Sequence, residues 1–176
     1  VYDFALPPLL LHALYTGAAA PLRVWLEVRR VNAVTVLDTH DGIGVIDIGP
    51  DQMGDGRPGL LTPAQVHALV EGIHERSGGQ SRQATGWAAS NVDVYQVNCT
   101  YYDALGRDDS ASLLARPVPF FTPGIPQVYS VGLLAGPTDL DLLARSAAAR
   151  ARHRPSLHRP WTHPHPPRPV PTLTGT

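Results

Sequence analysis

The stretch VTVLDTHDGIGVIDIG, Val34 to Gly49, joins an aliphatic segment to a polar tetrad and then becomes aliphatic again. Its first part is rich in β-branched residues between polar ones, which predicts a buried strand over residues 32–38. The tetrad Thr39-His40-Asp41-Gly42 follows at the carboxyl end of that strand. In parallel α/β folds the catalytic side chains come from this end of the strands. Asp41 is therefore a candidate general base, metal ligand or charge-stabilising carboxylate. A loop-capping role is an equal alternative on composition alone.

The composition indicates one folded domain without a strongly charged partner. Of 176 residues, 43% are hydrophobic and the formal net charge is -1, so neither a basic surface for nucleic acid nor an acidic tail is present. The longest apolar stretch, residues 4–14, is too short to span a membrane and does not resemble a signal peptide. We therefore expect no nucleic-acid and no membrane partner. The single cysteine, Cys99, fits a reducing compartment and is interpreted as a small buried apolar residue.

Apolar periodicity and capping signals predict alternating helices and strands. Pro7 and Pro8 open a helix that continues to Gly17, and Thr62-Pro63-Ala64-Gln65 is a capping-box pattern that opens another. The remaining expected elements are helices from residues 108 and 138 and strands from residues 92 and 124. This order is typical of an α/β fold with parallel crossovers. A whole TIM barrel needs about 250 residues, so a chain of this length would be a piece of one.

The histidines are interpreted as surface and tail residues. His67 and His74 flank the apolar stripe of the helix that begins after Thr62, and we expect both to face solvent. From residue 151 onward the chain has no acidic residue, seven prolines and four histidines, which predicts an extended, unpacked tail. The less favoured interpretation of that tail is a metal site built from His158, His163 and His165.

Four longer strings carry more information than composition or spacing. They are TVLDTHDGIGVIDIG, GLLTPAQVHALVEGIHERSGGQSRQATG, SNVDVYQVNCTYYDALG and PGIPQVYSVGLLAG. Together, over roughly residues 4–145, they resemble the sucrose phosphorylases of the α-amylase superfamily (glycoside hydrolase family 13). The resemblance implies a (β/α)8 barrel and a retaining double displacement, in which an Asp nucleophile takes the glucosyl group, a Glu is acid and base, and a further Asp stabilises the transition state. Phosphate is then the acceptor, and sucrose is converted to α-glucose 1-phosphate and fructose.

The resemblance also implies which part of the barrel is present. We expect residues 1–145 to run from about helix 6 to strand 8, with a loop-rich insertion after strand 7 that holds an acceptor-site region at about residues 43–107. Residues 146–176 are expected to be disordered or a frameshifted reading. One permitted back-translation of residues 150–158, read one nucleotide later, gives a string similar to the family's continuation. Because the chain starts at Val1, inside an apolar element, we expect a cut through a longer protein.

Site residues follow from the resemblance position by position. Asp41 matches the transition-state-stabilising Asp, and His40 matches the His that hydrogen-bonds the glucosyl hydroxyls. The string NVDVYQ resembles the acceptor-site loop and places Asp93, Tyr95 and Gln96 beside fructose or phosphate. Two other carboxylates of the opening stretch, Asp38 and Asp47, have no functional match and are interpreted as structural. Arg150 has the right separation from Asp41 for a phosphate-binding Arg, but its surrounding sequence does not match.

The departures from the family bear on activity. No motif here matches the family's nucleophile Asp or acid/base Glu, so this chain alone is expected to be inactive, and Pro117 and Pro119 interrupt a helix that is continuous in the family. The resemblance implies small-molecule substrates (sucrose, phosphate, glucose 1-phosphate, fructose), no metal or other cofactor, a cytoplasmic location and a possible homodimer of the full-length parent. The alternatives are a phosphorylase for sucrose 6'-phosphate or glucosylglycerate, or a non-catalytic remnant.

Overall fold

The computed structural model describes residues 1–50, 58–85 and 96–140. The elements are, in chain order, β1 (Tyr2–Asp3), α1 (Leu6–Thr16), α2 (Ala20–Val28), β2 (Val34–Thr35), β3 (Ile43–Gly44), a 3-10 turn (Ile46–Ile48), α3 (Pro63–Arg76), α4 (Gln80–Thr85), β4 (Gln96–Val97), α5 (Tyr101–Ala104), α6 (Asp109–Ala115), α7 (Val118–Phe121), β5 (Ile125–Pro126) and α8 (Ser130–Leu133). The fold class is α/β, as the sequence predicts. None of the described helices is long and apolar enough to cross a bilayer.

The main sheet has three parallel strands in the order β1-β2-β5. Val34 of the central strand is aligned with Tyr2 on one side and with Ile125 on the other. The sequence predicts β2 and β5 but not β1, since the first element expected from it is a helix. β1 is only two residues long and is followed almost at once by α1, so it leaves no alternating pattern to detect.

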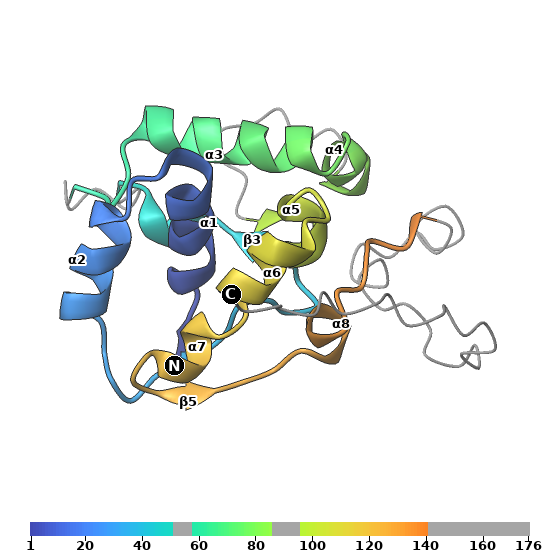
Figure 1. The fold of residues 1–176 in the computed structure, drawn as a ribbon. Helices are drawn as coiled ribbons and strands as arrows, with labels where there is room; N and C mark the ends of the chain where they lie inside the picture. Colours follow the sequence, from blue (N-terminus) through green and yellow to red (C-terminus); the bar gives the residue numbers. More distant parts are fainter. Residues whose placement is uncertain (51–57, 86–95, 141–176) are drawn as a thin grey trace, which may run out of the picture.

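The first helix forms as the sequence predicts. Pro7 and Pro8 lie in the first turn of α1, where a missing backbone N–H is harmless, and Gly17 ends the helix in the left-handed region at φ +74°. The buried leucines of α1 pack in a core with residues from β3, α3 and α5. Figure 1 shows α3 and α4 along one side of the molecule, over α1 and α5, with β5 near the N-terminus on the other side.

Between β2 and β5 the chain adds a second, antiparallel sheet and several helices. β3 pairs with β4, with Ile43 opposite Val97. Thr62 caps α3 in a complete capping box with Gln65, which confirms the sequence prediction. The expected strand over residues 92–97 is described only at Gln96–Val97, because residues 86–95 lie outside the described ranges. The predicted helix from residue 138 and the tail, residues 146–176, also lie essentially outside them.

Two local predictions need correction, and a third is confirmed. His67 is exposed as expected, but His74 is buried at 2% exposure, since its ring packs toward α4 and its Nδ1 lies 2.6 Å from Ser81 Oγ. The segment from residue 124, expected to be a strand and a loop, also contains the short helix α8. The proline pair does interrupt a helix: α6 ends at Ala115, and Pro117 is the N-cap of α7.

Candidate active site

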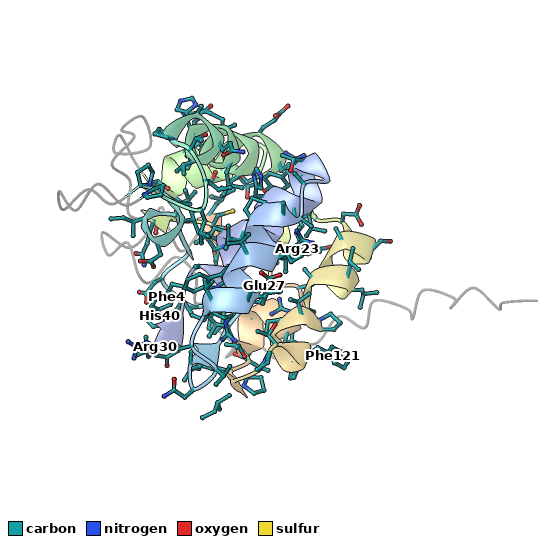
Figure 2. The ribbon with its side chains drawn as sticks, turned by 90° about the vertical axis from the view of Figure 1, so that its left-hand side faces the viewer. Phe4, Arg23, Glu27, Arg30, His40 and Phe121 are labelled. Carbon is teal, nitrogen blue, oxygen red and sulfur yellow. The ribbon has the colours of Figure 1, made fainter. Side chains whose placement is uncertain are left out.

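The predicted site lies where β2 runs into its following turn. Val36 and Leu37 are buried, whereas the side chains of His40 and Asp41 remain 42% and 31% exposed. His40 Nε2 lies 3.4 Å from Asp41 Oδ1, and the Asp41 amide donates to Thr39 Oγ1 at 3.2 Å. Figure 2 shows His40 at the surface, on the same side of the molecule as Phe4. The structure thus brings the two predicted residues together as an open carboxylate–imidazole pair.

Gly42 fixes the course of the backbone after this pair. Its φ of +93° is a conformation that L side chains rarely adopt, and a Cβ added there would lie 2.5 Å from the carbonyl oxygen of Val97. This close approach sets β4 against the segment after Asp41, and Gln96 is paired with Gly44. Gln96, a predicted substrate-binding residue, is exposed at this place. The other two, Asp93 and Tyr95, lie outside the described residues, as does Arg150, and their roles stay predictions.

Asp38 has a different environment from Asp41 although it is only three residues away. Both of its carboxylate oxygens accept from Arg116, Nη1 to Oδ1 at 2.9 Å and Nη2 to Oδ2 at 2.9 Å, and its side chain is 7% exposed. Asp47 is exposed in the 3-10 turn. The geometry of Asp38 confirms its interpretation as a structural carboxylate.

Other buried carboxylates near the core are also paired with arginines. Asp3 accepts from Arg29 Nε at 2.6 Å, and Asp103 accepts from Arg107 Nε at 2.7 Å. Within the described ranges, no group of three or more His, Cys, Asp and Glu side chains could hold a metal ion. Asp41 is a partly exposed carboxylate at a strand end, and one such group can stabilise positive charge or bind a hydroxyl. It cannot by itself act as both nucleophile and acid.

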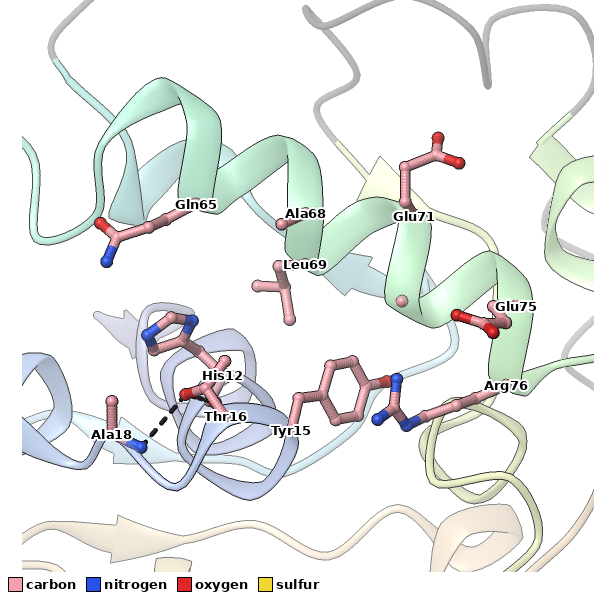
Figure 3. A pocket seen from close by; sticks show the side chains of 11 residues that line it. His12, Tyr15, Thr16, Ala18, Gln65, Ala68, Leu69, Glu71, Glu75 and Arg76 are labelled. Carbon is pink, nitrogen blue, oxygen red and sulfur yellow. Dashed lines mark hydrogen bonds between the residues drawn. The ribbon is translucent and has the colours of Figure 1, made fainter.

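A groove of about 520 Å³ lies elsewhere, between α1 and α3 (Figure 3). Arg76 stacks over the Tyr15 ring at 3.7 Å, and the Tyr15 hydroxyl donates to the Ala104 carbonyl at 2.5 Å. His12 also lines the groove, and burial lowers its pKa below the ordinary value. None of the predicted site residues lines this groove. No sequence signal indicates it, because it depends on how two distant helices pack.

Cys99 is a buried free cysteine, in agreement with its interpretation as a packing residue. Burial raises the pKa of its thiol well above the ordinary value, and the nearby Asp103 adds to this effect. The thiolate that a nucleophilic cysteine requires is therefore disfavoured. Cys99 has no place in the candidate chemistry.

Comparisons with known proteins agree with the resemblance of the four strings. The sucrose phosphorylase of Agrobacterium vitis is 64% identical over 154 residues, which is 88% of this chain and 31% of that protein. The sucrose phosphorylase of Bifidobacterium adolescentis is 57% identical over the same shares of the two chains. By sequence, this segment is consistent with a fragment of a sucrose phosphorylase. No family model matches the chain.

A solved structure supports the same assignment. The sucrose 6F-phosphate phosphorylase from Thermoanaerobacter thermosaccharolyticum superimposes with a TM-score of 0.70 at 39% identity, over 87% of this chain and 29% of that one. The chain therefore spans about a third of the length of the family members that it matches.

Proposed function

We propose that this chain is part of a sucrose phosphorylase, which converts sucrose and phosphate to α-glucose 1-phosphate and fructose with retention of configuration. The observation that supports this most directly is Asp41, a partly exposed carboxylate in the turn that follows the central parallel strand, in a chain up to 64% identical to sucrose phosphorylases. A phosphorylase for sucrose 6'-phosphate or glucosylglycerate is not favoured, because relatives with those names match at lower identity.

The three parallel strands support a barrel assignment. Their order in the sheet follows their order in the chain, as in a (β/α)8 barrel, and helices lie in each connection. We assign them as strands 6, 7 and 8, so that the described segment starts with strand 6 and not with helix 6. Residues 43–107 would then follow strand 7 and form the acceptor-site region, which contains more helix than the loop-rich insertion expected from the sequence.

In this assignment Asp41 stabilises the transition state and His40 binds the glucosyl hydroxyls. Positive charge develops on the sugar ring as the glycosidic bond breaks, and a fixed carboxylate beside the ring lowers the energy of that state. We assign Gln96 to the acceptor side, and its pairing with Gly44, three residues after Asp41, supports this assignment. Asp93 and Tyr95 would belong to the same side by their position in NVDVYQ.

The nucleophile Asp and the acid/base Glu would come from outside these 176 residues. The substrates are small molecules, and neither a metal nor an organic cofactor enters the proposed chemistry. A cytoplasmic location fits the single cysteine of the sequence, and a homodimer of the longer protein is also part of the proposal. For this chain alone we expect no release of glucose 1-phosphate from sucrose and phosphate. Turnover above background would contradict the assignment of the missing carboxylates.

The test uses a hybrid enzyme: the Agrobacterium vitis sucrose phosphorylase with its matching 154-residue segment replaced by that of this chain. The hybrid should catalyse phosphorolysis of sucrose. Asp41→Asn should lower kcat by about 100-fold or more, because a charge that acts in the transition state is lost. Asp47→Asn, a change of the same kind at an exposed aspartate, should leave kcat within about twofold. An inactive hybrid, or normal kcat in the Asp41 variant, would contradict the proposal.

A further inference from the structure

Asp38 and Arg116 form the most tightly held ion pair close to the candidate site. The two parallel Nη–Oδ contacts of 2.9 Å make a bidentate pair, the arrangement in which a guanidinium fixes both position and plane of a carboxylate. Arg116 Nη2 also donates to the carbonyl of Gly132 in α8 at 2.8 Å. The pair therefore joins α6, α8 and the end of β2.

The backbone of Gly132, which has no side chain, packs directly against the Asp38 carboxylate. A Cβ at Gly132 would lie 1.6 Å from Asp38 Oδ2 and 2.3 Å from Cγ, so no other residue fits there without moving the carboxylate. Asp38 is thus held by a guanidinium and enclosed by a helix backbone. Its main chain has little freedom to shift along the strand axis.

The turn that carries Asp41 is consequently fixed at both ends. Asp38 holds it on the strand side, and Gly42, in close approach to the Val97 carbonyl, holds it on the other side. Only Thr39, His40 and Asp41 lie between these anchors. Inside the turn, the Asp41 amide donates a hydrogen bond to the Thr39 hydroxyl. A displacement of Asp38 must therefore be passed on to the Asp41 carboxylate.

We propose that Arg116 is a positioning residue of the active site, which holds the Asp41 carboxylate in register with the sugar through Asp38 without touching substrate itself. The proposal rests on the role of Asp41 under the proposed function. A carboxylate that is misplaced by about 1 Å loses transition-state stabilisation by up to about 100-fold, whereas ground-state binding of the sugar depends on many other contacts. Loss of Arg116 should therefore lower kcat much more than it changes KM.

The hybrid enzyme tests this with two variants that disturb the pair by different routes. Arg116→Lys replaces the bidentate guanidinium by an ammonium group that acts as a single point charge. Gly132→Ala introduces a methyl group that clashes with Asp38 Oδ2 and leaves both charged residues unchanged. Both should lower kcat by about tenfold or more and change KM for sucrose by less than about threefold. Folding of each is checked by its thermal midpoint, and rates are taken well below the lower midpoint.

Arg29→Lys is the matched control. Arg29 forms a more deeply buried pair with Asp3, both side chains 1% exposed, and its guanidinium also donates to the carbonyl of Pro123, before β5, and not to α8. This variant should lower the thermal midpoint and keep kcat within about twofold. The inference is overturned if both Arg116→Lys and Gly132→Ala keep normal kcat, or if they reduce it no more than Arg29→Lys does. An unsubstituted hybrid without activity would instead overturn the proposed function, and with it this inference.

Discussion

The close approach between Gly42 and β4 predicts an unusually large cost for a single methyl group. Gly42→Ala introduces two separate penalties at this position. The first is the backbone conformation, φ +93°, which costs an L residue about 1–2 kcal/mol. The second is the contact itself, because the new Cβ would lie 2.5 Å from the Val97 carbonyl oxygen and 3.2 Å from the Asn98 Cα. Both neighbouring groups are backbone, so neither can rotate away.

The contact penalty follows from the distance that β4 must move. An ordinary carbon–oxygen contact is about 3.3 Å or more, so the strand must shift by roughly 0.8 Å or the turn must open. Overpacking of this kind costs about 1–3 kcal/mol. The expected loss in free energy of unfolding is therefore about 2–5 kcal/mol in total, which is a large part of the stability of an ordinary domain.

Gly17→Ala is the control that separates the two penalties. Gly17 has a similar positive φ, +74°, but no atom lies within 4 Å of the position that an added Cβ would take, so only the conformational cost of about 1–2 kcal/mol applies. Urea unfolding of the 176-residue chain, monitored by circular dichroism, gives the loss in free energy of unfolding for each substitution, provided that the slope m of the urea dependence is unchanged. If the two substitutions cost the same within about 0.5 kcal/mol, Gly42 does not lie against β4 and the strand-end turn is not anchored there.

Two further predictions concern α3 and α1. Thr62→Ala should lower the free energy of unfolding by about 1 kcal/mol, because the Gln65 amide loses its capping hydroxyl; Thr62→Ser keeps that hydroxyl and should cost far less, as urea titration can show. His12 has a pKa below 6.5 in the folded chain owing to burial, so the unfolded chain binds more protons just below pH 6.5. Stability should therefore be flat with respect to this group above that pH and fall as the pH decreases toward the folded pKa. His12→Gln should reduce this slope, and an unchanged slope would show that His12 is not its source.

Where the sequence predicted structure well, the signal was local. The capping box at Thr62, the prolines at the start of α1 and the aspartate N-cap at Asp108 each involve residues within one turn, and each is present in the structure. The strand β2 was also predicted, because a short run of β-branched residues reflects its burial between two other strands. These elements required no knowledge of the distant chain.

Where prediction failed, the missing information was a contact between distant or unrecognised elements. His74 was expected at the surface because it flanks the apolar stripe of α3. It is buried because α4 folds back against it and Ser81 meets its Nδ1 at 2.6 Å, and the polar composition of Gln80–Thr85 did not indicate a helix. β1 was missed because its evidence is its pairing with β2, which no pattern within two residues can reveal.

The two aspartates that follow β2 show the same limit for function. Asp38 and Asp41 stand three residues apart, and periodicity alone gives no reason to assign chemistry to one and structure to the other. The difference is a guanidinium that arrives from 78 residues further along the chain and takes both oxygens of Asp38, while Asp41 keeps a partly exposed carboxylate. If Arg116 keeps the turn in place, the structural aspartate, Asp38, is required for the function of Asp41. A change of Arg116 should then both displace Asp38 and reduce the transition-state stabilisation that Asp41 provides.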